Sequence, residues 1–280
     1  MRNSRHIGHH HRHLIISYPL SLSQRLYTLL WGPLLFIFIL FIALRLFSNT
    51  PLFSHIIPTL SGPDSLFFLF RALLLTLGRL FIAYVLALIC AIPLALLCTS
   101  NRRAESIFLP IFDILESVPA LAFFPILIIF FVRFNFLNGA AIFILFLSML
   151  WNLVFTLVGG LKIIPQDIKG VAKVFGLRGW PYLIKVILPA IFPQFVTGSI
   201  LAVAQGWNLI IVAEVLHVYI PAGSNTGDLF GLGSLLVQSA ASGQNDLFVM
   251  ALLFMILAIA FLNFFVWQKL LRYAERFRFE

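Results

Sequence analysis

The sequence predicts an all-α integral membrane protein with about six transmembrane helices. Its 280 residues are 61% hydrophobic and only 10% charged, and the mean hydropathy is +1.03. A soluble domain, by contrast, carries about 25% charged residues. Several apolar runs reach the roughly 20 residues that a helix needs to cross a bilayer. Because lipid offers no partners to backbone N–H and C=O groups, each run must pair them internally, as a helix.

Six apolar runs account for the predicted spans, at 29–47, 67–98, 107–132, 139–161, 189–217 and 247–270. The second run is longer than a bilayer requires, so its helix is expected to tilt or protrude. Pro93, Pro119 and Pro125 fall inside runs, where neighbouring helices can satisfy the carbonyls that proline leaves unpaired. The glycine-bearing segment 221–234 is expected to be a flexible outer turn, or alternatively a contact for a partner protein.

The chain divides into a basic, histidine-rich cytoplasmic tail, residues 1–28, and a membrane domain, residues 29–280. The tail holds five of the seven histidines. Clustered imidazoles can bind a metal, but no carboxylate or cysteine lies nearby to complete a site, which favours a disordered basic tail. The run that follows lacks the small-residue cleavage site of a signal peptide, so we expect an uncleaved first span.

The positions of lysine and arginine predict the orientation. With a cytoplasmic amino terminus, 15 of the 19 Lys and Arg residues fall on the cytoplasmic side, many of them in the loops 99–105 and 162–188. Cytoplasmic loops carry such an excess, so both termini are expected to be cytoplasmic. The same distribution argues against a nucleic-acid partner for this basic chain, because the charges mark the ends of the spans.

The largest of these loops, 162–188, is predicted to contain a short amphipathic helix at 165–175. Pro165 suits a first helical position, and Asp167 lies in the first turn. One apolar stripe then follows at helical spacing, formed by Ile168, Val171, Ala172 and Phe175. The helix is too short to cross a membrane, so its stripe must lie either on lipid headgroups or on a cytoplasmic partner. The residues alone leave both alternatives open.

Gly176 is predicted to end this helix in a left-handed conformation, with Lys173 in the last turn. Pro181 can then start a second short helix that runs to Leu188. Pro189 is expected to interrupt the helix there, before the fifth span begins.

The loop resembles the "EAA…G…I-x-L-P" loop of permease subunits of binding-protein-dependent ABC importers. Ala172 and Gly176 are followed, after nine residues, by "VILP" at 186–189. Three further segments are similar to the nitrate, sulfonate and taurine branch of that family: 76–97, 118–131 and 212–216. The similarity extends over about residues 66–280.

This resemblance implies a type I ABC importer permease fold with a cytoplasmic coupling helix, in a multi-pass protein of the bacterial inner membrane. The implied partners are cytoplasmic ABC ATPase subunits, a second copy or a similar permease, and an extracytoplasmic solute-binding protein. This chain would hold no cofactor, because ATP and Mg²⁺ would be bound by the ATPase, and no G-x-x-x-x-G-K-[ST] loop occurs in it. The solute would be small, with an anion such as nitrate, sulfonate or taurine expected.

The resemblance also assigns contact with the ATPase to particular residues: Asp167, Ile168, Gly170, Val171, Ala172, Lys173, Phe175, Gly176, Leu188 and Pro189. The chain departs from the family pattern at the Glu, which is Gly170 here, and at the first Ala, which is Val171. In the family that Glu contributes polar contact to the ATPase. Such contact would here have to come from Asp167 or from the lysines.

Polar residues inside the runs are candidates for a translocation path, because ionisable groups at mid-bilayer are costly and usually face the bundle interior or water. Asp113 and Glu116, three residues apart on one helix face, could line a path or bridge to Arg79. The bridge is favoured, since two free carboxylates would disfavour an anion. Glu214 is expected near the outer end, where its charge costs little. The candidate path residues are Glu116, Trp151, Asn152, Gln205, Trp207, Asn208 and Glu214.

Two other classes of function compete with a permease. A membrane-embedded enzyme would need a nucleophile with its base or a cluster of metal ligands, whereas His55 and His217 are isolated. A secondary transporter favours inverted repeats and more intramembrane carboxylates. No repeat is evident, and the loop helix would be unexplained. We therefore expect neither catalytic residues nor a metal site.

Overall fold

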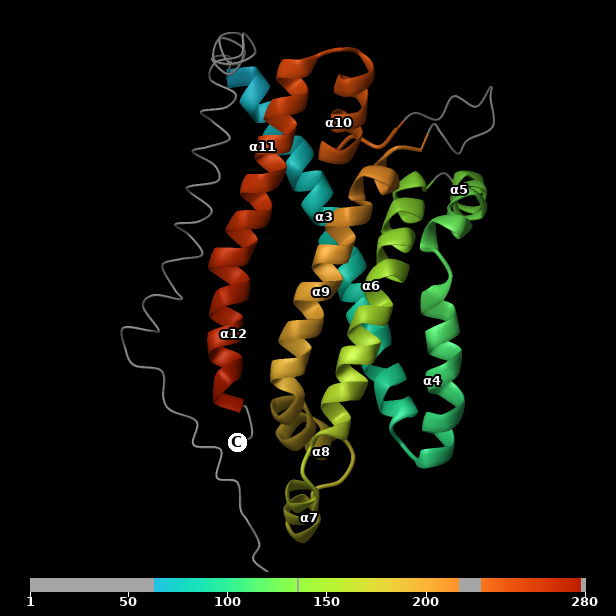
Figure 1. The fold of residues 1–280 in the computed structure, drawn as a ribbon, viewed down its shortest axis with the longest axis vertical. Coiled ribbons are helices and arrows are strands. Elements are labelled where there is room, and N and C mark those ends of the chain that lie inside the picture. Colours follow the sequence, from blue (N-terminus) through green and yellow to red (C-terminus); the bar gives the residue numbers. More distant parts are fainter. Residues whose placement is uncertain (1–62, 135, 217–227, 278–280) are drawn as a thin grey trace, which may run out of the picture. The chain divides into compact units, whose positions relative to one another are not determined.

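The computed structural model describes residues 63–134, 136–216 and 228–277, which lie in one compact unit, residues 55–280. Within these ranges every regular element is a helix and no strand occurs (Figure 1), as the composition predicts. The predicted tail 1–28 and the predicted first span 29–47 lie outside the described residues.

Four helical segments of the described part are long and apolar enough to cross a membrane, in agreement with four of the predicted spans. The first is α3, Pro63–Cys98, which contains Pro93 without interruption, and the second is α6, Leu137–Lys162. The third consists of α8 (Trp180–Tyr182), a π-helix (Leu183–Ile187) and α9 (Leu188–Glu214). The fourth consists of α11 (Asn245–Phe261), a π-helix (Leu262–Trp267), α12 (Gln268–Ala274) and a 3₁₀ turn (Glu275–Phe277).

The expectation of one continuous span at 107–132 is wrong. Two helices, α4 (Arg102–Ser117) and α5 (Phe124–Arg133), are separated by a 3₁₀ turn at Ala120–Phe123, and the bend at the break is 74°. Pro119 is the physical cause, because its ring forces the preceding residue out of the helical region. Val118 accordingly has an extended backbone, with φ −75° and ψ 120°.

Pro189 does not interrupt the chain before the fifth span, contrary to expectation. The helix runs without a break from Trp180 to Glu214. Just before the proline the Leu188 N–H donates to the Leu183 carbonyl, five residues back, in the π-helical register. A proline disrupts the α-helical register, and the wider π turn carries the helix past it.

A further short helix, α10 (Leu232–Ala241), starts inside the segment 221–234, which was expected to be a flexible turn or a contact for a partner protein. The Gly231 N–H and carbonyl both pair with the Ser234 hydroxyl at 3.1 Å, which fixes the start of the helix. α10 packs mainly against α11 and α9. Gly231 and Gly233 therefore mark the start of a helix.

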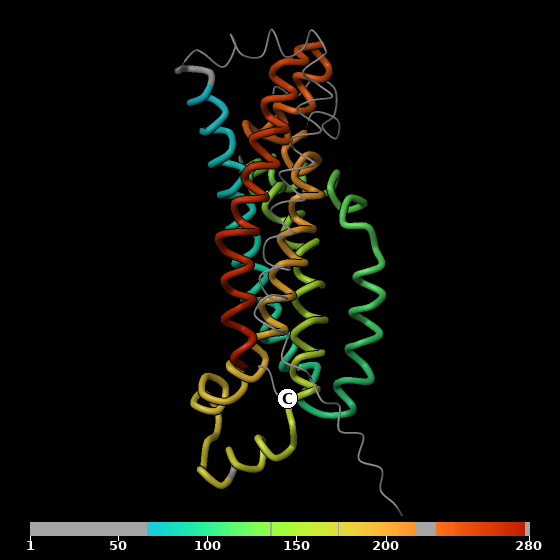
Figure 2. The backbone as a smooth tube through the Cα atoms, turned by 60° about the vertical axis from the view of Figure 1, so that its left-hand side comes forward, coloured from blue at the N-terminus to red at the C-terminus, as the bar shows by residue number. Residues whose placement is uncertain are grey.

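The core of the unit is α6, which packs most extensively against α9 and α3 (Figure 2). Small residues on α9 permit this contact, as in other membrane helix pairs. A side chain at Gly198 would collide with Thr156, and one at Gly206 would collide with Met149. The Tyr84 and Ser199 hydroxyls, 2.7 Å apart, add a hydrogen bond between α3 and α9.

Candidate functional site

The short helix α7, Gln166–Val174, projects from one end of the helix bundle, whereas α5 and α10 lie at the other end (Figures 1 and 2). α7 begins one residue after and ends one residue before the helix predicted at 165–175. Gly176 has a φ of +67°, and the Leu177 N–H donates to the Ala172 carbonyl at 3.0 Å. A left-handed glycine with this bond is a Schellman cap. The predicted end of the helix is therefore confirmed.

The apolar residues of α7 divide into an inward and an outward set. Ala172 is only 3% exposed, because it packs against its own chain, whereas Val171 is 55% and Phe175 is 77% exposed. Val174, at 86%, is the most exposed of them. Helical spacing predicts the same role for Ala172 as for Val171 and Phe175, and it does not identify Val174. The adjacent apolar pair at 174 and 175 is the sequence signal that could have identified it.

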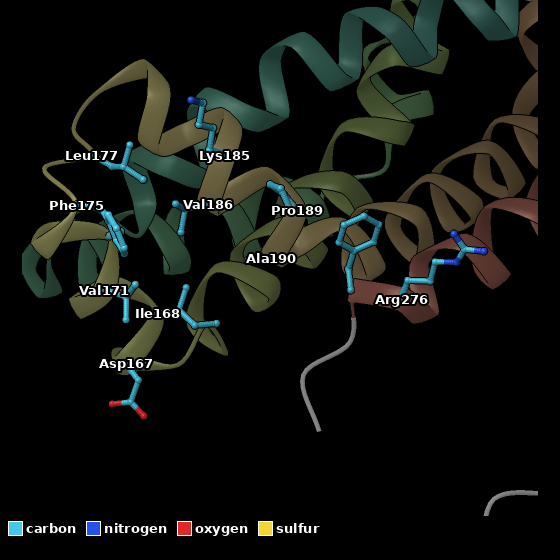
Figure 3. Close-up of a pocket in the computed structure, with 12 residues that line it drawn as sticks. Asp167, Ile168, Val171, Phe175, Leu177, Lys185, Val186, Pro189, Ala190 and Arg276 are labelled. Atoms are coloured by element: carbon cyan, nitrogen blue, oxygen red, sulfur yellow. The ribbon is translucent and has the colours of Figure 1, made fainter.

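A cavity of about 510 Å³ lies between α7, the start of the fifth span and the carboxyl-terminal turn. Ile168, Val171 and Phe175 surround it together with Val186, while Asp167 points away toward the outside (Figure 3). The cavity is mainly apolar and is open to the surface, since Val171 and Phe175 on its wall remain 55% and 77% exposed.

The remaining coupling candidates lie around this helix. Gly170 is exposed, and no atom lies within 4 Å of the place where its Cβ would stand, so the family's Glu would fit there. Leu188 and Pro189 form the first turn of α9 and are half-buried. Lys173 lies on α7 between the buried Ala172 and the exposed Val174.

A second cavity, of about 420 Å³, lies beside the break between α4 and α5. Its lining comes from the end of α4, the Val118–Pro119 break, α6 and α9. Four of the seven path candidates line it, namely Glu116, Trp151, Asn152 and Gln205. The structure thus brings together candidates that are up to 89 positions apart in the sequence. Trp207, Asn208 and Glu214 do not line this cavity.

Glu214 lies instead in a buried network near the other end of α9. Its Oε1 accepts hydrogen bonds from Arg79 and from the Thr76 hydroxyl, each at 2.7 Å, and its Oε2 accepts from the Gly233 N–H at 2.7 Å. Glu214 is 0% exposed, and Arg79 is 7% exposed. The network therefore ties α3, α9 and the start of α10 to one another.

Arg79 uses its remaining donors within the same network. Its Nε donates to Asn138 on α6 at 2.8 Å, and its second amino group donates to the Phe230 carbonyl at 3.0 Å. A side chain at Gly231 would collide with the Glu214 carboxylate. Because Gly231 has no side chain, the backbone before α10 can approach the carboxylate closely.

This network corrects two expectations. Arg79 pairs with Glu214, 135 positions away, rather than with Asp113 or Glu116, both of which are exposed on α4. Glu214 is fully buried, so its charge would be costly without a partner, whereas only a small cost was expected near the outer end of the helix. Thr76, three residues before Arg79 on the same helix face, was missed. Its spacing from Arg79 is the signal that could have found it.

Comparison with known proteins gives a consistent result. Residues 91–271 match the family described as binding-protein-dependent transport system inner membrane component. The chain is 32% identical over 195 residues to the nitrate import permease protein NrtB of Leptolyngbya laminosa, across 70% of this chain and 65% of that protein. It is 33% identical over 148 residues to the bicarbonate transport system permease protein CmpB of Synechococcus elongatus, across 53% and 52%. The chain thus spans between half and two thirds of the length of these relatives.

A solved structure of the MetNI methionine ABC transporter, in an inward-facing conformation, contains a chain of the same fold. The TM-score is 0.60 at 19% identity, and the superposition covers 76% of this chain and 99% of that chain. The likeness shows the fold. It confirms the expected type I ABC importer permease architecture.

Proposed function

This chain belongs to the family of binding-protein-dependent transport system inner membrane components, and from that premise we propose that it is the permease subunit of an ATP-driven importer of a small solute. In this role the chain provides a path through the bacterial inner membrane and catalyses no reaction itself. The observation that carries the proposal is α7. It is too short to cross a membrane, lies at the end of the bundle and exposes Val171, Val174 and Phe175.

The exposed apolar face of α7 is proposed to dock a cytoplasmic ABC ATPase subunit. An exposed apolar surface next to basic residues is stable only when a partner or lipid covers it. ATP and Mg²⁺ would be bound by that ATPase. A second copy of this chain, or a similar permease, would complete the translocation path, and an extracytoplasmic solute-binding protein would deliver the solute at the opposite end.

The names of the relatives support a small anion as the solute, such as nitrate or bicarbonate. The sequence resemblance likewise implies a small anion, such as nitrate, sulfonate or taurine. We place the path at the second cavity, because it gathers Glu116, Trp151, Asn152 and Gln205 beside a break in a membrane helix. Irregular backbone at membrane depth is tolerated where it lines a cavity.

The test of this function is purification of the tagged chain from its native membrane. An ATP-hydrolysing subunit should co-purify, and solute uptake by the reconstituted complex should require ATP and a solute-binding protein. Uptake by the chain alone, driven by an ion gradient, would instead identify a secondary transporter. Turnover of a substrate in the membrane without transport would identify an enzyme.

Gly176→Val should uncouple ATP hydrolysis from transport without preventing assembly. The left-handed φ of Gly176 costs a β-branched residue about 1–2 kcal/mol, which is small beside the stability of the packed spans. No atom lies within 4 Å of its added Cβ, so the effect is conformational rather than a collision. α7 should then meet α8 at a changed angle. The measurement is ATP hydrolysis stimulated by the solute-loaded binding protein in the reconstituted complex.

Gly159→Val is the matched control for this variant. Gly159 lies within α6, is not a coupling candidate and is equally free of neighbouring atoms, but its φ is not positive. Gly159→Val should therefore retain the stimulation of ATP hydrolysis. Equal stimulation in both variants would show that Gly176 is an ordinary loop glycine.

Both termini and the loops 99–105 and 162–188 are proposed to be cytoplasmic, on the basis of the lysine and arginine distribution. Ser100 and Ser242 are exposed at opposite ends of the bundle and provide the test. With Cys90 and Cys98 replaced by alanine, a membrane-impermeant maleimide should label Ser242→Cys on intact cells. It should label Ser100→Cys only after the membrane is opened. Labelling of Ser100→Cys from outside would reverse the proposed topology.

A further inference from the structure

The sixth span, Asn245–Phe277, is the least buried of the four long membrane helices that the structure describes. Of its apolar window, 17% is buried inside the protein, compared with 28% for α3, 56% for α6 and 39% for the fifth span. Its first part, α11, packs mainly against α10. Among the described elements, its contact with α9 comes mainly from α12 and the turn Glu275–Phe277. The span is therefore attached mainly near its two ends.

Three aromatic rings form the attachment at the α7 end. The Phe192 ring on α9 meets the rings of Tyr273 and Phe277 edge to face, with centroid distances of 5.7 and 5.4 Å. Tyr273 and Phe277 are four residues apart, and their rings are also 5.4 Å apart. Edge-to-face contact at such distances is favoured by the quadrupole of each ring. We call these three residues the ring cluster.

The ring cluster lies beside the cavity at α7. Phe277 lines that cavity together with Ile168 and Phe175 of the α7 segment, so it contacts the ring cluster and also borders the space next to the short helix. Ala274, which follows Tyr273, is only 2% exposed, so α12 is closely packed at this point. Movement of α7 or of the start of the fifth span would therefore reach the sixth span through this turn.

The sixth span also has an attachment at the end opposite α7. There α11 packs against α10, whose first residue, Leu232, donates its N–H to the Thr76 hydroxyl at 2.9 Å. Between the two attachments a π-helix, Leu262–Trp267, comes directly before α12. Wide turns of this kind inside helices are frequent at functional sites. The sixth span thus connects α10 at one end of the bundle with the ring cluster at the other.

We propose that the ring cluster carries movement between the sixth span and α7, with Phe277 as the positioning residue of this contact. This inference rests on the proposed function and deepens it, because it adds a route to the ATPase that does not run along α9. A solute-binding protein that displaces α10 would move the sixth span. The rings would pass that movement to the start of the fifth span, which leads through α8 to α7. Closely packed side chains suit this role, because they switch between discrete arrangements and do not deform continuously.

The test is the stimulation of ATP hydrolysis by the solute-binding protein in the complete reconstituted complex. The binding protein is used as purified from cells, with the solute that it carries, so the solute need not be identified. Phe277→Ala should lower the stimulation at least about fivefold, the lower end of the coupling typical between two sites. The ATPase should still co-purify. Phe277→Tyr keeps the ring and should retain the stimulation.

Phe265→Ala is the matched control. Phe265 lies on the same span, its ring stacks on Phe261 with centroids 4.8 Å apart, and the Lys269 ammonium lies 5.7 Å from its centroid. The variant therefore also removes a ring pair, but one within the sixth span itself. It should retain the stimulation of ATP hydrolysis.

A covalent link separates transmission of movement from stability. In a complex whose native cysteines are replaced, Phe192→Cys combined with Phe277→Cys should lose the stimulation, and a short bifunctional thiol reagent that joins the two positions should restore it. Stimulation that Phe277→Ala leaves unchanged, that Phe265→Ala lowers equally, or that the link does not restore would overturn the proposal. Absence of stimulation in the native complex, or failure of any ATPase to co-purify, would instead refute the proposed function.

Discussion

Replacing Glu214 with glutamine is expected to lower the stability of the protein by about 3–5 kcal/mol, because it leaves the guanidinium of Arg79 buried without a counter-charge. The pair is joined at 2.7 Å, and the Glu214 side chain is 0% exposed. The same carboxylate accepts from Thr76 and from the Gly233 backbone, so the variant also loosens the start of α10. The melting temperature of the purified protein should fall by roughly 10 °C.

The chain offers a matched control for this variant. Glu105 and Lys162 form an ion pair of the same 2.7 Å length between α4 and α6, but their side chains are 38% and 41% exposed. Glu105→Gln should therefore cost at most about 1 kcal/mol. Arg79→Gln combined with Glu214→Gln should recover part of the loss, because no buried charge is then unpaired. Equal effects of Glu214→Gln and Glu105→Gln would show that burial of the first pair has no energetic consequence.

Replacing both Val174 and Phe175 with aspartate is expected to abolish association with the ATPase while the chain still folds and inserts. The two side chains are 86% and 77% exposed, so charge there costs little in the free subunit. In an apolar interface the same unpaired charges would cost about 3 kcal/mol or more, which lowers affinity at least about a hundredfold. The measurement is co-purification of the ATPase with the tagged permease, together with its yield and melting temperature.

Phe134→Asp is the control for this experiment. Phe134 is also a largely exposed phenylalanine, at 64%, but it follows α5 at the end of the bundle opposite α7 (Figure 1). It should leave ATPase association intact. Ala172→Asp is a poorer probe than the sequence suggests, because Ala172 is buried against its own chain and a charge there would displace α7 itself. Full retention of the ATPase by the Val174→Asp, Phe175→Asp variant would favour a helix that rests on lipid headgroups.

The local features of this chain could be predicted from the sequence alone. Apolar runs long enough to cross a membrane identified α3, α6, the fifth span and the sixth, since lipid leaves helix as the only open-chain solution. The helix at α7 and its end at Gly176 were likewise predictable, because a helix stripe, a first-turn carboxylate and a left-handed glycine cap are all properties of a few neighbouring residues.

Proline shows where local reasoning stops. Pro93 remains inside a continuous helix, Pro119 produces a 74° break, and Pro189 is passed by a π turn. The residue is the same in each case, and it removes the same N–H group. Whether the helix continues depends on what the surrounding helices and the adjacent backbone can supply. Only the packed structure contains that information.

The sequence by itself determined that this is a helical membrane protein, where its long helices lie and that a short capped helix interrupts them. The tertiary structure alone decided that Arg79 pairs with Glu214, that Ala172 faces inward and that Glu116 shares a cavity with Gln205. The physical reason is the separation in sequence between the residues that interact. Helix formation and capping depend on residues within a few positions. A buried charge and its partner, or the residues that line a cavity, come from helices tens of positions or more apart, which meet only after the helices pack.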